Sequence, residues 1–376
     1  MKLGIIGTSL KKNEKRVPIH PEHLSEISTE IRQQLVFEQG YGERFGFSDA
    51  TLLALGVGLA PRQTLLESMD AVLLLKPMPA DFENLRPGGV HWGWPHCMQQ
   101  VANTQAAIDR RLTVVAMEQM FIRDEQGKRI LHPFYKNNEM GGYCAVLHAL
   151  ALKSMDGNYG KKRKVVILSF GAVGQGALRA LQGRGFTDIT VCTQQRSETE
   201  RPAGLENCEF RRIRQEQGQW VITEPDGRTR PLLALLLESD IWINAILQDP
   251  NHPVMYMNET DVARIKPGTY ILDISCDEGL GFPFSRPTSF DAPLIEMGHF
   301  DYYAVDHTPN YLWECASWEV SQALLPYLPE FLKGPAHWAQ TRIFREAIEI
   351  QAGEIQNSEI LAFQKREPVY PHAMLV

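Results

Sequence analysis

Residues 164–196 constrain the fold of this chain more than any other stretch, because they read as one supersecondary unit. Their sequence is KVVILSFGAVGQGALRALQGRGFTDITVCTQQR. Residues 165–168 form a continuous apolar run, which is typical of a parallel strand buried on both faces. A glycine-rich turn, an apolar stripe at helical spacing and a second apolar run at 189–192 follow. This order predicts a βαβ unit.

The glycine-rich turn is suited to the phosphates of a dinucleotide cofactor. Gly171, Gly174 and Gly176 are expected to allow positive φ and to let backbone N–H groups approach a pyrophosphate. When the turn is aligned on the G-x-G-x-x-G pattern, Ser169 takes the first glycine position. An ordinary βα turn without a ligand is the alternative, since a glycine pattern alone is weak support. The residues expected at the cofactor phosphates are Ser169, Gly171, Ala172, Val173 and Gly174.

The end of the second strand bears on which cofactor is bound. NAD-binding folds carry Asp or Glu there to hold the ribose 2′-OH, whereas this chain continues Thr193-Gln194-Gln195-Arg196. The missing carboxylate removes a repulsion against a 2′-phosphate, and Arg196, alone or with Arg201, could pair with that phosphate. The sequence therefore favours NADP(H). The alternative is NAD(H), with Arg196 as a solvated loop residue.

Length and composition exclude several classes of protein. A chain of 376 residues with 44% hydrophobic residues fits two domains of ordinary size. A net charge of −7 argues against a sequence-independent nucleic-acid binder. The first apolar run is too short for a signal peptide, and no stretch is long enough to cross a membrane. The six cysteines lack metal-ligand spacing, so we expect a cytoplasmic protein with reduced thiols and no metal.

The regions around the βαβ unit indicate a larger α/β architecture. Between residues 1 and 135, apolar runs alternate with helix-compatible stretches, which predicts a mainly parallel sheet. Residues 139–155 predict a helix that is apolar nearly all round and buried between two domains, with Gly141 and Gly142 permitting close approach. The tail after residue 334 has helical periodicity through residue 363.

These segments predict two Rossmann-like doubly wound domains with an active-site cleft between them. The dinucleotide-binding domain is expected at 139–311, and a substrate domain at 1–138 plus 312–376, completed by C-terminal helices. Within the first, the polar stretch 197–232 predicts a β-hairpin with tight turns at Gln217-Gly218 and Asp226-Gly227.

Polar residues at predicted strand ends are the candidates for chemistry. Arg16 follows the first strand, Lys76 follows residues 71–75, His96 follows the strand near residue 90, and Asp277 follows residues 270–274. Each alone is more often structural, and Asp277 could be a turn or helix-cap residue. Their common placement favours function, because the carboxyl ends of parallel strands line the ligand crevice of such folds.

The order of these motifs resembles that of the superfamily of alanine dehydrogenase, saccharopine dehydrogenase and N5-(carboxyethyl)ornithine synthase, over nearly the whole chain. The resemblance implies that Arg16 in EKRVPIHPE binds a substrate carboxylate and that Lys76 in LLLKPMP is the active-site lysine. It further implies that His96 in GWPHC is the catalytic histidine and that Asp277 in DISCDEG lies beside the nicotinamide.

Two branches of the superfamily compete. The motifs DISCDEG, VDHTPN and MEQMFIRDEQGKR are similar to lysine-forming saccharopine dehydrogenase, whereas GWPH and YKNNEMGGYCAVLHA are similar to carboxyethylornithine synthase. Both are opine-type enzymes, which join or separate an amino acid (lysine- or ornithine-like) and a 2-oxo acid (pyruvate or 2-oxoglutarate) through an imine that NAD(P)H reduces. One alternative is alanine dehydrogenase, which uses free ammonia and usually has a fuller glycine turn than SFGAVG. The other is a non-catalytic NADP(H)- or ketimine-binding protein.

The candidate residues match the needs of the opine reaction. Arg16 can form a bidentate pair with a carboxylate. Lys76 and His96 can move protons if burial and mutual repulsion bring their pKa values near neutrality. Glu118, at a strand end, either tunes that pair or makes a structural salt bridge, and Asp277 would orient the amine or the nicotinamide. Asn244 and Asp306, near later strand ends, complete the expected cofactor site. The sequence leaves open whether the protein is a monomer or a homo-oligomer.

Overall fold

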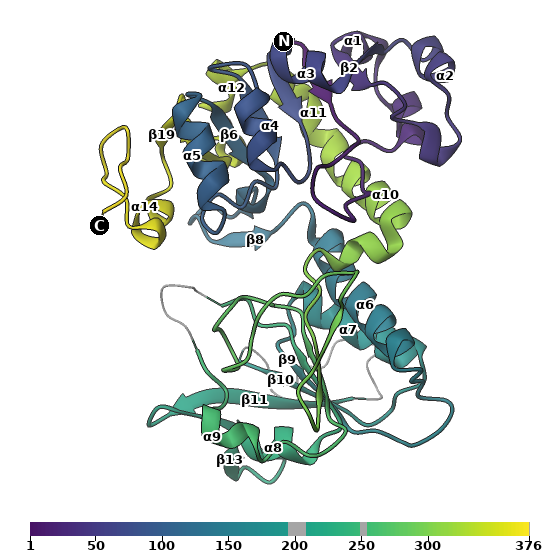
Figure 1. Cartoon of the computed structure of the whole chain (residues 1–376), viewed down its shortest axis with the longest axis vertical. Coiled ribbons are helices and arrows are strands. Elements are labelled where there is room, and N and C mark those ends of the chain that lie inside the picture. Colours follow the sequence, from purple (N-terminus) through teal and green to yellow (C-terminus); the bar gives the residue numbers. More distant parts are fainter. Residues whose placement is uncertain (195–207, 249–253, 376) are drawn as a thin grey trace. The chain divides into compact units, whose positions relative to one another are not determined.

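The computed structural model describes residues 1–194, 208–248 and 254–375. The chain folds into two compact units (Figure 1). Unit 1 comprises Met1–Tyr135 and Trp313–Val376, and unit 2 comprises Lys136–Leu312. Each unit is built on a sheet with mainly parallel strands, which confirms the predicted α/β class. No helix of the described part of the chain is long and apolar enough to cross a membrane.

Unit 1 contains an eight-stranded sheet in the order β19-β18-β6-β5-β4-β1-β2-β3. The six strands from β6 to β3 are parallel, because each apolar run is followed by a helical crossover. The strands of this sheet are β1 (Leu3–Ile5), β2 (Leu35–Glu38), β3 (Gly58–Ala60), β4 (Ala71–Leu73), β5 (Val90–Gly93), β6 (Thr113–Ala116), β18 (Ile348–Gln351) and β19 (Glu354–Ile355).

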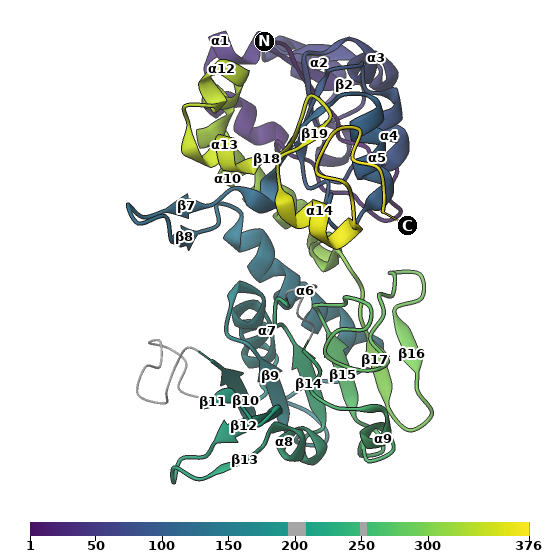
Figure 2. The same ribbon diagram turned by 90° about the vertical axis from the view of Figure 1, so that its left-hand side faces the viewer.

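Helices cover both faces of this sheet (Figure 2). Helices α10 to α13 pack on one face, where Trp92 of β5 stacks on Phe331 of α11 with ring centroids 4.2 Å apart. On the other face, α3, α4, α5 and α14 contribute Leu65, Phe82 and Ile360 to a second apolar layer. The helices of unit 1 are α1 (Thr29–Arg32), α2 (Asp49–Ala54), α3 (Arg62–Ser68), α4 (Pro79–Asn84), α5 (Val101–Asp109), α10 (Trp313–Leu324), α11 (Leu328–Leu332), α12 (Pro335–Trp338), α13 (Arg342–Ala347) and α14 (Ser358–Gln364).

The helical prediction for the C-terminal tail is wrong between residues 348 and 355. Helix α13 ends at Ala347, and the chain continues as the hairpin β18–β19, with β18 antiparallel to β6. Ala352 and Gly353 both have positive φ (51° and 86°), as a two-residue hairpin turn requires. Pairing with the otherwise open edge of β6 thus prevails over the helical spacing of the apolar residues.

Unit 2 contains a nine-stranded sheet in the order β13-β12-β11-β10-β9-β14-β15-β17-β16. The order reverses at β9, so the carboxyl ends of β9, β10 and β14 form a topological switch point. The predicted tight turns at Gln217-Gly218 and Asp226-Gly227 connect β11, β12 and β13. The strands are β9 (Val165–Leu168), β10 (Ile189–Thr193), β11 (Glu209–Glu216), β12 (Gln219–Thr223), β13 (Thr229–Pro231), β14 (Ile241–Asn244), β15 (Tyr270–Asp273), β16 (Leu294–Glu296) and β17 (Asp301–Tyr303).

The βαβ unit at 164–196 forms as predicted up to the end of β10, but its glycines act differently. Helices α6 (Tyr135–Leu152) and α7 (Ala172–Gly183) cover one face of the sheet, and α8 (Leu232–Glu238) covers the other. The positive φ of the turn belongs to Ser169 (87°), whereas Gly171 has a φ of −69°. A Cβ on Gly174 would lie 2.3 Å from the Ser169 carbonyl oxygen. This glycine is therefore needed for close approach and not for positive φ.

Helices α6 and α7 approach each other so closely that two neighbouring glycines should respond oppositely to substitution. A Cβ on Gly142 would lie 1.8 Å from the Val173 carbonyl oxygen, whereas a Cβ on Gly141 meets nothing within 4 Å. We expect Gly142→Ala to lower the free energy of unfolding by roughly 3 kcal/mol through overpacking. Gly141→Ala, the matched control, should raise it by about 0.5 kcal/mol through helix propensity. Urea unfolding followed by circular dichroism measures both, and equal midpoints would contradict the packing.

Candidate active site

The structure brings Lys76 and His96 into contact at the carboxyl ends of β4 and β5. The Lys76 ammonium nitrogen Nζ lies against His96 Nε2. Lys76 is held in place by the chain before it, since residues 71–75, which comprise β4 and the two positions after it, are buried and Pro77 begins the turn into α4. His96 has a φ of 48°, the left-handed conformation that His adopts more readily than most residues.

The surroundings of Lys76 favour its neutral form. Burial lowers the pKa of Lys76 to about 7, and the positive charges of Lys11 and Arg16 act in the same direction. Glu14 and Glu118 oppose this shift. A lysine with a pKa near neutrality can accept and return a proton at physiological pH.

Arg16 is close to this pair, but its guanidinium group is already engaged. Arg16 is 4% exposed, and its Nε and Nη2 donate to the two carboxylate oxygens of Glu14 at 2.9 and 2.6 Å. Arg16 and Lys76 also both lie over the ring of Trp94, at 5.8 and 5.9 Å from its centroid. The bidentate geometry expected for a substrate carboxylate is thus present, with the Glu14 carboxylate in that position. Sequence reasoning missed Glu14, although it stands two residues before Arg16 in NEKR.

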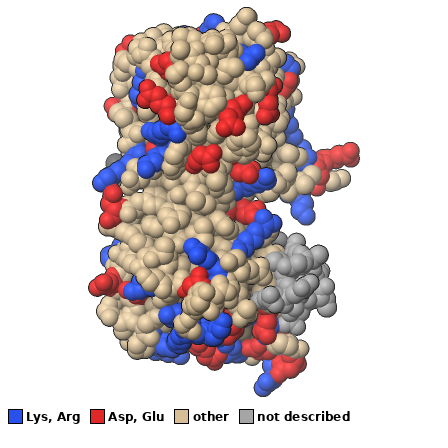
Figure 3. All heavy atoms as spheres, turned by 90° about the vertical axis from the view of Figure 1, so that its right-hand side faces the viewer, with Lys and Arg blue, Asp and Glu red and all other residues tan. Residues whose placement is uncertain are grey.

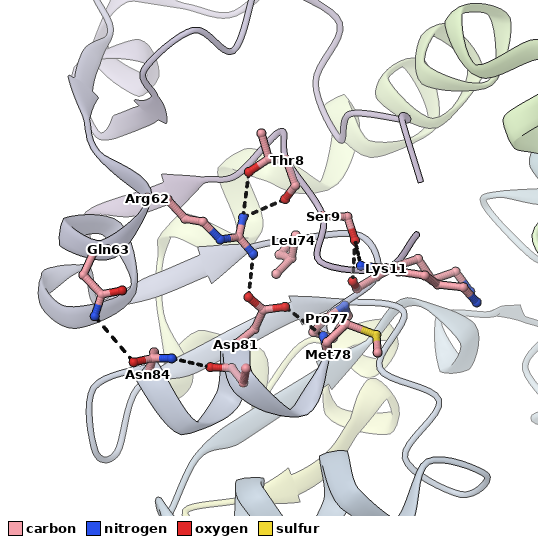
Figure 4. A network of polar contacts seen from close by, with 12 residues as sticks. Thr8, Ser9, Lys11, Arg62, Gln63, Leu74, Pro77, Met78, Asp81 and Asn84 are labelled. Carbon is pink, nitrogen blue, oxygen red and sulfur yellow. Dashed lines mark hydrogen bonds and ion pairs between the residues drawn. The ribbon is translucent and has the colours of Figure 1, made fainter. Parts of the chain in front are cut away.

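A polar network braces the loop that carries Lys76 (Figure 4). Arg62 of α3 donates to the carbonyl oxygen of Thr8 at 2.6 Å and to the Asp81 carboxylate. Asp81 also accepts from the backbone N–H of Met78 at 2.8 Å, and Ser9 Oγ donates to the Lys76 carbonyl oxygen at 3.1 Å. The loop after β1 and the loop after β4 are therefore tied together. No spacing in the sequence pointed to Arg62 or Asp81.

Glu118 lies behind His96. Glu118 follows β6, and its Oε1 accepts from the His96 backbone N–H at 2.8 Å and lies 3.7 Å from His96 Nδ1. The pKa of Glu118 is raised to about 8, by burial first and by the charge of Glu349 second. Glu349 was not predicted as a site residue. It is separated from Glu118 by more than half of the chain and comes close only because β18 pairs with β6.

In unit 2, a buried carboxylate shapes the turn after β15. Asp273 is fully buried and accepts from Asn244 Nδ2 (2.9 Å), Ser285 Oγ (3.0 Å) and Tyr302 Oη (2.9 Å). The backbone N–H of Cys276 also donates to it, at 3.2 Å. Asp273 thereby anchors the turn that carries Asp277, whose pKa is raised by burial and by Asp273. Asp273 was missed, and its only signal is a carboxylate at the end of the apolar run YILD.

The predicted cofactor residues of unit 2 gather at the switch point. Ser169, Thr193 and Asn244 lie at or just beyond the carboxyl ends of β9, β10 and β14. The first-turn N–H groups of α7 have no intrahelical acceptors and no side-chain cap, which suits a pyrophosphate. Asp306 contacts His307 Nδ1 beyond β17. Arg196 and Arg201, expected to pair with a 2′-phosphate, lie outside the described residues.

Acidic and basic side chains are interspersed over the face of the molecule in Figure 3, without a continuous basic field of the kind that nucleic-acid binding requires. Within residues 1–194, 208–248 and 254–375, no group of three or more His, Cys, Asp or Glu side chains could hold a metal ion.

Two α/β units, one with a lysine–histidine pair and one with a glycine turn at a switch point, define a class of dinucleotide-dependent oxidoreductase. Residues 6–135 match the family model for the alanine dehydrogenase/PNT N-terminal domain, and residues 158–358 match that for the C-terminal domain. The chain belongs to the alanine dehydrogenase/PNT family, a family of oxidoreductases that use nicotinamide cofactors. This confirms the resemblance predicted from the motifs.

Relatives of two kinds are similarly distant in sequence. N(5)-(carboxyethyl)ornithine synthase of Clostridium botulinum is 27% identical over 338 residues, covering 86% of this chain and 92% of that protein. Alanine dehydrogenase of Mycobacterium tuberculosis is 28% identical over 349 residues, covering 88% of this chain and 87% of that protein. Among solved structures, an L-alanine dehydrogenase is 19% identical with a TM-score of 0.76, and the match covers 96% of this chain and 99% of that chain. The transhydrogenase of Sinorhizobium meliloti is 17% identical with a TM-score of 0.72, and the match covers 94% of this chain and 100% of that chain. These structures confirm the fold of two Rossmann-like units.

Proposed function

We propose that the protein is an opine-type oxidoreductase that joins the amine of a lysine- or ornithine-like amino acid to a 2-oxo acid, or separates them. The contact between Lys76 and His96 carries the proposal, together with the near-neutral pKa of Lys76. The reaction needs groups that remove and return protons while an amine adds to a carbonyl carbon. The motifs GWPH and YKNNEMGGYCAVLHA favour this reaction over the use of free ammonia.

The residues of unit 1 would handle the substrate. Neutral Lys76 accepts a proton from the attacking ammonium group, so that the amine nitrogen can form its bond to the carbonyl carbon. The Lys76–His96 pair then returns a proton to the carbinolamine oxygen, which leaves as water when the C=N bond forms. Arg16 holds the carboxylate of the 2-oxo acid once that group takes the place of the Glu14 carboxylate. In the reverse direction the same groups add and remove the same protons.

The residues of unit 2 would hold the cofactor, with the pyrophosphate on the first turn of α7 and the nicotinamide near Asn244 and Asp277. When bound, the cofactor supplies the hydride that reduces the imine carbon. We infer a preference for NADP(H), because β10 ends at Thr193 and Gln194 follows it, with no carboxylate at either position. A cavity of about 340 Å³ beside Gln194 supports this preference, since the exposed Arg212 contributes to its lining.

The proposal is tested by the dependence of NADPH oxidation on two substrates. A panel of diamino acids and 2-oxo acids is assayed by NADPH fluorescence, with NADH in parallel. We expect oxidation only when both an amine and an oxo acid are present. Oxidation with ammonia and pyruvate alone would assign the protein to alanine dehydrogenase activity. Binding of NADPH without turnover for any pair would identify a binding protein.

The Glu14–Arg16 pair predicts an effect on oxo-acid binding. Glu14→Gln keeps one hydrogen-bond acceptor for Arg16 but removes the charge that competes with the substrate carboxylate. We expect the KM for the 2-oxo acid to fall roughly tenfold, the equivalent of about 1.4 kcal/mol, with the KM for the amine unchanged. Steady-state kinetics at saturating amine measure this. Glu26→Gln, an exposed carboxylate of the same unit, is the control, and an unchanged oxo-acid KM in Glu14→Gln would remove Arg16 from substrate binding.

A further inference from the structure

Glu349 is a buried carboxylate in a place where a strand residue is normally apolar. It lies on β18 between Ile348 and Ile350, where the pairing with β6 is irregular, and it is 2% exposed. Its Oε1 accepts from the side-chain amides of Gln119 (3.4 Å) and Asn357 (3.2 Å), and its Oε2 receives no N–H or O–H donor. In the described part of the chain, no Lys, Arg or His forms a salt bridge with it. A purely structural carboxylate at this depth would normally be paired.

The surroundings of Glu349 include the segments that carry Glu118 and His96. Gln119, which donates to Glu349, follows Glu118 directly. The buried thiol of Cys97 follows His96 directly, and its pKa is raised by burial first and then by the charges of Glu349 and Glu118. Glu118 Oε2 is likewise buried without a hydrogen-bond partner. Burial raises the pKa of Glu349, and the negative charge of Glu359 at the start of α14 acts in the same direction. The charge of Glu349 raises the pKa of Glu118, so ionisation of one carboxylate disfavours ionisation of the other.

The charge is expected to reside on Glu349, because its carboxylate has more donors than that of Glu118. Glu118 then keeps the proton, and its pKa is raised to about 8, by burial first and by Glu349 second. This state matters for Lys76, since an ionised Glu118 would raise the pKa of Lys76, whereas a neutral one would not. Lys11 and Arg16 lower that pKa, and Glu14 raises it.

We propose that Glu349 is a positioning residue that keeps a proton on Glu118, so that Lys76 remains a neutral base for the amine-addition step. The inference rests on the proposed function for the role of Lys76, but the shared proton itself can be observed without turnover. It assigns a part in the chemistry to the C-terminal hairpin β18–β19.

The kinetic test uses Glu349→Gln in the full chain, which keeps an acceptor for Gln119 and Asn357 but lacks the charge. Glu118 should then ionise at neutral pH and raise the pKa of Lys76. We therefore expect the acid limb of the kcat/KM profile to move up by roughly one pH unit, with little change at its plateau. Glu354→Gln, an exposed carboxylate of the same hairpin, should leave the profile in place. An unmoved limb in Glu349→Gln would overturn the proposal, because a merely structural role would lower activity at all pH values alike.

A spectroscopic test separates this inference from the proposed function. Infrared difference spectra of the wild-type protein between pH 6.5 and pH 9 should show the loss of a protonated buried carboxyl band, which is expected to be absent in Glu118→Gln. If the band is absent from the wild type, the inference fails whatever the enzyme does, and this holds even if Glu349→Gln does not fold. If the band is present but no amine and oxo-acid pair is turned over, the proposed function fails and the proton-sharing pair stands.

Discussion

Lys76→Met is expected to lower turnover by roughly 10³-fold while leaving the affinity for NADPH unchanged. Methionine matches the length and part of the packing of lysine over Trp94, but it carries no proton and no charge. His96 loses its partner, so neither addition of the amine nor loss of water from the carbinolamine has its proton donor and acceptor. The kcat at saturating amine and oxo acid gives the loss, and fluorescence titration gives the Kd of NADPH.

Lys333→Met is the matched control for this experiment. Lys333 is an exposed lysine of the same unit, ion-paired with Glu330 three residues earlier, and its loss should change stability and turnover little.

In the wild type, kcat/KM should fall as the pH drops below about 7, because the pKa of Lys76 is about 7 and its neutral form is the reactive one. Unchanged turnover in Lys76→Met would contradict the assignment of Lys76 to the active site.

Much of the fold follows from local patterns in the sequence. Residues 165–168 and 189–192 are strands in the structure, and α7 lies between them, because continuous apolar runs and a helical apolar stripe are signals within short windows. The positions of Lys76 and His96 were also predictable. Parallel strands place their carboxyl ends at one edge, so residues that follow neighbouring strands come together even 20 positions apart.

The parts that could not be predicted depend on partners that are distant in sequence or on local competition between groups. The contact of Gln119 with Glu349 spans 230 positions and exists only because β18 adds to the edge of β6. No window of sequence contains both, and the helical spacing around residue 348 pointed to a different structure. The guanidinium group of Arg16 was expected to bind a substrate carboxylate. Only the three-dimensional arrangement shows that the Glu14 carboxylate occupies that position.

Arg212→Gln is expected to weaken NADPH binding by 10- to 100-fold while leaving NADH binding unchanged, as the loss of roughly 1.5–3 kcal/mol from a charged hydrogen bond implies. Arg212 on β11 is the register partner of Thr193 at the end of β10, and both Arg212 and Gln194 line the cavity of about 340 Å³. Arg212 is exposed and forms no ion pair with any described residue. A 2′-phosphate beside Gln194 would give this guanidinium a partner.

Arg214 provides a matched control two residues along the same strand. It lines the same cavity, but its guanidinium is bound to Glu216 at 2.7 Å and to Thr223 Oγ1 at 2.6 Å. Arg214→Gln should therefore change the Kd of NADPH less than twofold, by roughly 0.4 kcal/mol or less. If the wild type binds both cofactors equally, the absence of a carboxylate after β10 does not select NADP(H). If NADPH is preferred and only Arg196→Gln weakens it, the phosphate is held by the loop after β10 and not by β11.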